Sequence, residues 1–171
     1  MEVKKSIFDY GFLMENFTNQ IQLLLANPVL IACILSWFTA QLIKTLIKLC
    51  IGKVHSVAEL FELVLWRTGS MPSSHASLVT CLCTMIAFRS GVDSDIFILS
   101  LCFFLVTIRD AMGVRRSSGI QSKLLNRISS VLSENGLMDS QTVKETDGHS
   151  PLEVFVGCLI GFFIGIAFCL L

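Results

Sequence analysis

The sequence is poor in charged side chains. Only 15% of its 171 residues are Asp, Glu, Lys or Arg, where soluble domains carry about a quarter. The 18 residues of Val154–Leu171 contain no charge at all, and Pro28–Ile47 contains one ionisable residue, Lys44. Runs of this length and composition are typical of helices that cross a membrane. The scarcity of charge therefore argues against a soluble protein.

Neither sign of charge is in excess. Thirteen Lys and Arg residues balance thirteen Asp and Glu residues, so the formal net charge is zero. Domains that bind nucleic acid carry a basic patch or stripe, and the sequence shows no such footprint. We therefore expect no nucleic-acid partner.

The sequence also lacks the patterns that hold metals or disulfides. Its seven cysteines include no C-x-x-C pair, and its three histidines have no paired carboxylates at ligand spacing. Most of the cysteines fall in apolar runs, where we expect small buried side chains. We expect no metal, no disulfide and no cofactor. No cleavable signal peptide is evident, because Asp9 and Glu15 interrupt the stretch after Lys4 and Lys5.

Four apolar segments predict an all-α fold, a polytopic membrane helix bundle with about four membrane helices. The two middle segments, Ala76–Phe88 and Ile96–Ile108, contain 13 residues each. With their flanks, each reaches roughly 25 Å at 1.5 Å per residue, a thin fit to the hydrocarbon layer. A re-entrant pair over residues 74–108 is the alternative.

Two amphipathic segments complete the predicted fold. Residues 6–26 mix apolar and polar side chains, and we expect an N-terminal interfacial helix there. Residues 117–135 place apolar side chains at helical spacing and predict an amphipathic helix on the cytoplasmic side. Residues 1–171 then form a single integral membrane domain, with 1–27 as the interfacial segment and 28–171 as the core.

The distribution of cations predicts the orientation. With four spans, the loop between the first two segments and the loop between the last two lie on the same side. Together with the end of the first segment, they hold ten of the thirteen Lys and Arg residues. The positive-inside rule makes this side cytoplasmic. We expect a multi-pass protein of a bacterial cytoplasmic membrane, with its active site on the cytoplasmic side.

Three polar motifs fall on that side, each at the end of an apolar segment. They are residues 69–75 (GSMPSSH), 109–116 (RDAMGVRR) and 148–153 (GHSPLE). The first would lie at a helix N-terminus, where free N–H groups and the helix dipole favour a bound anion. A His beside an anion can donate a proton to a leaving oxygen. Gln41 and Lys44 share a helix face and could point into the same space.

These motifs carry a resemblance to a known family. Met-Pro-Ser-Ser-His, Asp-Ala-x-Gly-Val-Arg-Arg and Gly-His-x-Pro-x-Glu-Val, in this order and spacing, resemble the divergent branch of the type 2 phosphatidic acid phosphatase family. That family is related to bacterial acid phosphatases and vanadium haloperoxidases. The resemblance covers roughly residues 28–171. It implies a metal-independent phosphatase that works through a phosphohistidine.

The resemblance implies a role for each matching residue. His149 would be the nucleophile, Glu153 would orient its ring, and His75 would be the general acid. The remaining matches would bind phosphate or support the site: Ser73, Ser74, Arg115, Arg116 and Lys44 for phosphate, with Asp110 and Gln41 in support.

The chain departs from the wider superfamily at several points. Ser74 stands where the superfamily has Gly, and Glu153 stands where it has Asp. No Arg lies six residues before His149, and the superfamily's Lys-x6-Arg-Pro motif is absent. We assign the missing cation to Arg115 or Arg116. Simpler interpretations stay open, because Ser150 and Glu153 also form a capping box, and Asp110 could simply pair with a nearby Arg.

The predicted function is hydrolysis of a phosphate monoester on a membrane lipid. The candidate substrates are phosphatidylglycerophosphate, phosphatidic acid and isoprenyl phosphates or diphosphates. Membrane lipids are the expected partners, and a homo-oligomer is open. The first alternative is a non-catalytic membrane protein that binds anionic lipid or acts as a scaffold. The second is a vanadate-dependent oxidase that shares the fold.

Overall fold

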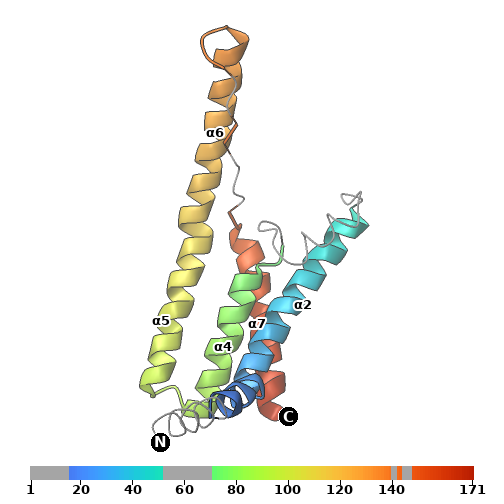
Figure 1. The fold of residues 1–171 in the computed structure, drawn as a ribbon, viewed down its shortest axis with the longest axis vertical. Helices are drawn as coiled ribbons and strands as arrows, with labels where there is room; N and C mark the ends of the chain where they lie inside the picture. The colour runs from blue at the N-terminus through green and yellow to red at the C-terminus, as the bar shows by residue number, and fades with distance from the viewer. Residues whose placement is uncertain (1–15, 52–70, 140–141, 144–147) are drawn as a thin grey trace, which may run out of the picture.

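The protein is an all-helical bundle in the part of the chain that the structure, a computed structural model, describes: residues 16–51, 71–139, 142–143 and 148–171. This part contains no β-strand, as the all-α prediction requires. Its elements are shown in Figure 1: α2 (Pro28–Cys50), α4 (Ser74–Ser90), α5 (Asp95–Arg109), the π-helix η1 (Asp110–Val114), α6 (Arg115–Glu134) and α7 (Pro151–Leu170).

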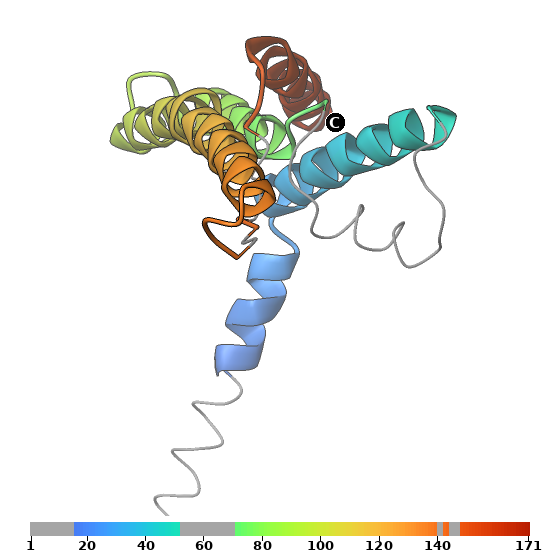
Figure 2. The same cartoon turned by 90° about the horizontal axis from the view of Figure 1, so that it is seen from above.

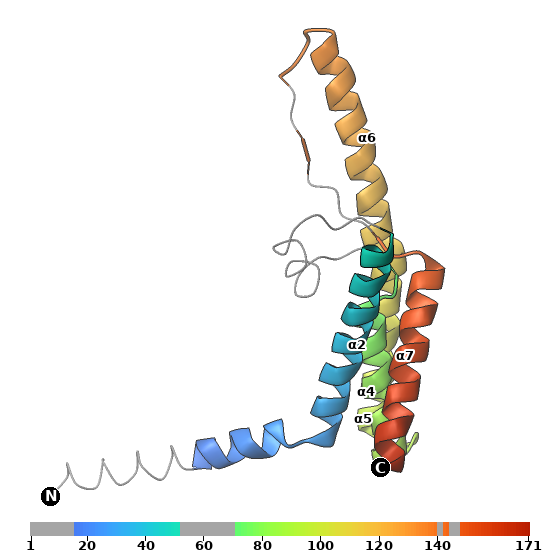
Figure 3. The ribbon, with the colours of Figure 1, turned by 90° about the vertical axis from the view of Figure 1, so that its right-hand side faces the viewer.

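Three helices of the described chain are long and apolar enough to cross a membrane. They are α2, α7 and the continuous 40-residue helix of α5, η1 and α6. The fourth predicted membrane helix, α4, has only 17 residues, yet it packs against α2, α5 and α7. The turn between α4 and α5 lies at the same end of the bundle as the C-terminus of α7 (Figures 1 and 3). The helices α4 and α5 therefore both run the length of the bundle, which disfavours the re-entrant alternative for residues 74–108.

Capping residues explain where the helices begin. The side chains of Ser73, Ser94 and Ser150 accept hydrogen bonds from backbone N–H groups in the first turns of α4, α5 and α7. Asn27 does the same for α2 and is followed by Pro28 at the first helical position. The sequence thus places the helix starts, and two of them belong to the predicted motifs.

Glycine allows α7 to pack directly on the backbone of α4. Gly157, Gly161 and Gly165 recur every fourth residue, so they form one face of α7. A Cβ added at Gly157 or Gly161 would overlap the carbonyl oxygen of Ser73 or Ser77. No other residue type fits at these two positions without a shift of the helices. We call this α4–α7 interface the glycine seam.

The interface between α2 and α4 contains both polar and apolar contacts. The hydroxyls of Ser36 and Ser77 lie 2.7 Å apart, and each is also within hydrogen-bonding distance of the other residue's carbonyl oxygen, so two protons are shared among three contacts. Below them, Cys33 and Cys81 are buried in an apolar cluster. The cysteine prediction holds for these two residues, whereas Cys50 and Cys102 are exposed on the outside of the described bundle.

The two amphipathic segments leave the bundle in different directions. Residues 16–25 are helical and exposed, and they extend away from the lower end of α2 at a steep angle to it (Figures 2 and 3). This arrangement fits the predicted interfacial helix, of which residues 6–15 lie outside the described chain. The predicted helix over 117–135 is also present, as α6. It continues the line of α5 and projects beyond the bundle (Figure 1).

Candidate active site

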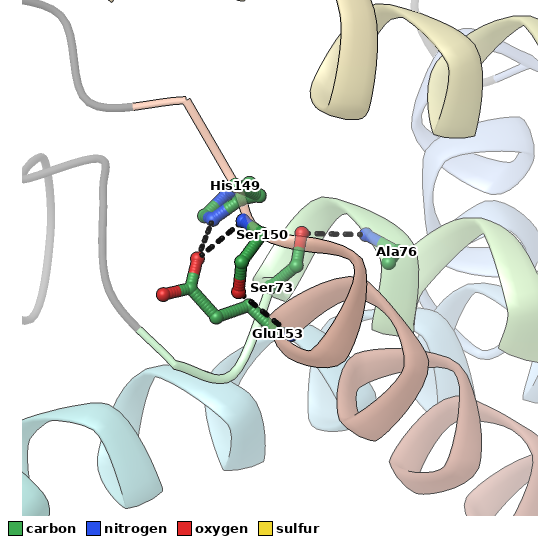
Figure 4. A network of polar contacts seen from close by, with 5 residues as sticks. All are labelled: Ser73, Ala76, His149, Ser150 and Glu153. Atoms are coloured by element: carbon green, nitrogen blue, oxygen red, sulfur yellow. Dashed lines mark hydrogen bonds and ion pairs between the residues drawn. The ribbon is translucent and has the colours of Figure 1, made fainter. Parts of the chain in front are cut away.

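The first and third motifs meet where α4 and α7 begin. The N–H of Ser73 donates to the carbonyl oxygen of Glu153 at 3.0 Å, which ties the two helix starts together. Figure 4 shows His149, Ser150 and Glu153 beside Ser73 at this junction. The glycine seam directly below holds the two backbones in this register. Residues 69 and 70 of the first motif lie outside the described chain.

A His–Glu pair with a buried imidazole is the central feature of the site. The Nδ1 of His149 lies 3.1 Å from the Oε2 of Glu153, and His149 is only 4% exposed. A carboxylate can only accept hydrogen bonds, so Nδ1 carries the proton and Nε2 keeps its lone pair. The same Oε2 accepts the N–H of Ser150 at 3.1 Å, and the Ser150 hydroxyl accepts the N–H of Glu153 at 3.4 Å. Glu153 therefore completes a capping box and orients His149 at once.

The π-helix connects the second motif to the same histidine. The N–H of His149 donates to the carbonyl oxygen of Ala111 in η1 at 3.3 Å. Short π-helical turns of this kind are frequent at functional sites. Gly148 lies directly on the first turn of α6, where an added Cβ would overlap the N and Cα atoms of Arg116. Backbone contacts on both sides thus place His149.

Two cations act on His149 from different helices. Lys44 on α2 is 1% exposed, and its charge acts on the imidazole of His149. Arg115 at the start of α6 does the same, and its Nε donates to the Oδ2 of Asp110 at 2.8 Å. Asp110 therefore pairs with Arg115, the simpler of the interpretations open for this residue. Such a set of positive charges around a neutral imidazole suits a bound phosphate.

The surroundings keep His149 neutral. Burial lowers the pKa of its imidazole from the ordinary value near 6.5, and the charges of Lys44 and Arg115 lower it further. The hydrogen bond and the charge of Glu153 act in the opposite direction and raise it. Because burial has the largest effect, the net shift is downward. The side chain is then an unprotonated base at neutral pH, the form that a nucleophile requires.

The chain is similar to a known protein family and to a known membrane protein. Residues 25–164, most of the chain, match the divergent PAP2 family. The chain belongs to this family. It is also 33% identical over 154 residues to the uncharacterized membrane protein YuiD of Bacillus subtilis (strain 168), a match that covers 82% of this chain and 93% of the relative. No solved structure matches the chain. The resemblance seen in the three motifs is confirmed, and the chain is related to a membrane protein.

Several of the other residues that the resemblance implied lie close to this pair. His75 is exposed in the first turn of α4, close enough to Arg115, His149 and Lys44 for their charges to act on its imidazole. Ser74 is buried one residue earlier. Within the described chain, no hydrogen bond or ion pair joins the guanidinium of the exposed Arg116 to the site. The contribution of Arg116 is its backbone, on which Gly148 rests.

The side chains of Ser73 and Gln41 differ in their hydrogen bonds. The hydroxyl of Ser73 accepts the N–H of Ala76 at 3.4 Å and so caps α4. Gln41 is 4% exposed, and its Oε1 has no hydrogen-bond partner among the described residues. A buried acceptor without a donor costs free energy. Gln41 lies one helical turn before Lys44 and therefore on the same face of α2.

Two backbone contributors, Ala111 and Gly148, were not predicted from the sequence. Ala111 acts through its carbonyl oxygen, which no side-chain pattern can reveal. Gly148 had a weak signal, since a glycine directly before the motif histidine often marks a close backbone approach. Neither role could be assigned before the packing of α6 against the start of α7 was known.

Proposed function

We propose that the protein hydrolyses a phosphate monoester on a membrane lipid through a phosphohistidine intermediate. The observation that carries this proposal is the pair of buried His149 and half-buried Glu153, with the charges of Lys44 and Arg115 acting on the imidazole. A histidine held by a carboxylate at one ring nitrogen presents the other as a nucleophile, as in hydrolytic triads. Membership of the divergent PAP2 family supports a phosphatase-related function.

In the first step, Nε2 of His149 attacks phosphorus. The P–N bond forms while the bond to the lipid oxygen breaks, and His75 gives its proton to the leaving alkoxide. Glu153 holds the Nδ1 proton and stabilises the positive charge that develops on the ring. The exposed position of His75 in the first turn of α4 gives it access to a lipid oxygen.

In the second step, water replaces the enzyme at phosphorus. His75, now neutral, takes a proton from the water, the new P–O bond forms, and the P–N bond breaks to release inorganic phosphate and free His149. Charge spreads over the equatorial phosphoryl oxygens during both steps, so positioning and cations supply most of the catalysis.

Cations and helix N–H groups hold the phosphate oxygens in this proposal. Arg115 is the preferred guanidinium, because its charge acts on both histidines and Asp110 fixes its position. Lys44 supplies a second positive charge from α2. The start of α4, at Ser73 and Ser74, contributes the favourable end of a helix dipole. Gln41 supports this group from the adjacent turn of α2.

The substrate would be phosphatidylglycerophosphate, phosphatidic acid or an isoprenyl phosphate or diphosphate. By the positive-inside rule the site faces the cytoplasm, and we place the protein in the cytoplasmic membrane of a bacterium, without a metal or other cofactor. Reporter fusions at the α4–α5 turn and within residues 135–147 test the orientation. A cytoplasmic α4–α5 turn would contradict it.

Purified protein assayed against a panel of lipid phosphates tests the activity. We expect phosphate release that vanadate inhibits and EDTA does not. A ³²P-labelled substrate should leave acid-labile, base-stable label on the wild type and none on His149→Ala. His55→Ala is the matched control, because this third histidine belongs to none of the three motifs. Phosphate release that survives both His149→Ala and His75→Ala would overturn the mechanism. Lipid binding without release from any lipid would favour the scaffold alternative.

A further inference from the structure

A large groove runs along one face of the α5–η1–α6 helix. Its volume is about 970 Å³, at the upper end of the roughly 300–1,000 Å³ of typical ligand pockets. Its α5 and η1 part is lined mostly by apolar side chains with the cation of Arg109 among them, and its α6 part is lined by polar side chains. Its lining residues include, in chain order, Leu105, Ile108, Arg109, Met112, Val114 and Gln121.

The groove lies next to the proposed active site. Ile108 and Met112 line it, and both also pack against the buried cluster of Ala76, Ala111 and Val154. Ala76 and Val154 are the cluster members that matter for the site. These two core residues directly follow His75 and Glu153 in the sequence. The side chains of Ile108 and Met112 therefore lie between the groove and the core cluster that packs beneath the proposed catalytic residues.

The groove also continues into the surface that faces the membrane. Leu105 at its apolar end and the neighbouring Val106 are exposed on α5, within a helix apolar enough to span the hydrocarbon layer. Arg109 lies within the mostly apolar part of the lining. Apolar side chains with one cation among them suit the hydrocarbon chain of an anionic lipid.

We propose that this groove holds the hydrocarbon chain of the substrate lipid while its phosphate reaches His149. The inference rests on the proposed function and names its substrate class: a long-chain lipid monoester that enters sideways from the bilayer. A soluble phosphate ester would leave the groove empty. The chain in the groove is what selects lipids over soluble esters of the same headgroup.

Gly113 offers a clean way to close the groove. It lines the groove, and an added Cβ there would meet no atom within 4 Å. Gly113→Phe therefore places a ring in open space without a backbone collision. Gly113→Ala is the matched control, because it removes the same glycine and leaves the groove open. Gly113→Leu gives an intermediate filling.

The test uses two readouts on full-length protein in nanodiscs. The first is photo-crosslinking to phosphatidic acid with a diazirine in its acyl chain, mapped by mass spectrometry. The second is the ratio of hydrolysis rates for dioleoyl and dihexanoyl phosphatidic acid. We expect crosslinks within residues 105–121 in the wild type and Gly113→Ala. Gly113→Phe should lose them, and the long-to-short ratio should fall about tenfold, as expected when a pocket loses several apolar contacts.

The two readouts separate failure of the inference from failure of the proposed function. Crosslinks that map elsewhere, or that persist in a folded Gly113→Phe protein, would overturn the groove assignment even if hydrolysis occurs. An unchanged long-to-short ratio in Gly113→Phe would do the same. Crosslinks in the groove without hydrolysis of any lipid would retain the lipid site and overturn the phosphatase. Thermal unfolding of each variant verifies that it is folded.

Discussion

The two sides of α4 are built differently. On one side, α7 lies in backbone contact through Gly157 and Gly161. On the other side, α5 is mostly exposed, and Ser100 is its single buried residue in the described chain. The tight side positions His149 and Glu153, whereas the open side contains the groove. The candidate site therefore lies between a closely packed interface and an open helix surface, the surface at which we propose that lipid enters.

The strongest test of the tight side is Glu153→Gln. Glutamine still completes a capping box, so α7 should start at the same residue while the ring of His149 loses its carboxylate. We expect kcat to fall by about 10³–10⁴-fold, by analogy with loss of the carboxylate in a Ser-His-Asp triad. Steady-state kinetics with unchanged thermal unfolding checks this. A loss below tenfold would reduce Glu153 to a helix cap.

The variants Arg115→Ala and Arg116→Ala compare two adjacent cations at the start of α6. Removing Arg115 should cost about 10²–10³-fold in kcat/KM, the usual effect of losing one group that stabilises transition-state charge. Arg116→Ala keeps the backbone on which Gly148 rests, so its effect should be small, as for other exposed side chains. Lipid hydrolysis rates measure both. Equal losses would show that Arg116 also holds phosphate.

Alanine at two glycines measures the packing contrast directly. Gly161→Ala puts a methyl group into the Ser77 carbonyl and should destabilise the fold by about 1–3 kcal/mol, typical of overpacking. Gly113→Ala meets open space and should stabilise a helix by up to about 1 kcal/mol. Unfolding in detergent measures both changes. A Gly161→Ala protein as stable as the wild type would mean that the seam is looser than its geometry indicates.

The smallest predicted effect is a shift of the pH profile. His149 must be neutral to attack, so the acidic limb of kcat/KM should lie below the ordinary pKa near 6.5. Glu153 raises the pKa of His149, so the limb of Glu153→Gln should move to lower pH. Lys44 lowers it, so the limb of Lys44→Met should move to higher pH. Shifts in the reverse directions would assign the limb to another group.

Much of the site could be predicted from the sequence because its parts are local. Ser150, Pro151 and Glu153 form a capping box within four residues, and the i, i+4 spacing brings Glu153 back to His149. The separation of Arg115 from Arg116 could not be predicted, because adjacent residues on a helix point about 100° apart and only the packing shows which one faces the site. The direction of α6 depended likewise on its continuity with α5 through η1.

The amino-acid sequence is enough to predict a helical membrane protein of one family, with three motifs at one end of the bundle. Apolar run length, helix capping and motif order are properties of the chain that packing does not change. The packed helices were needed to show that Ala111 and Gly148 hold His149, that Gly157 and Gly161 form a seam, and that a groove opens at Gly113. These features depend on how closely backbones from distant segments approach, and that distance is set when the helices pack together.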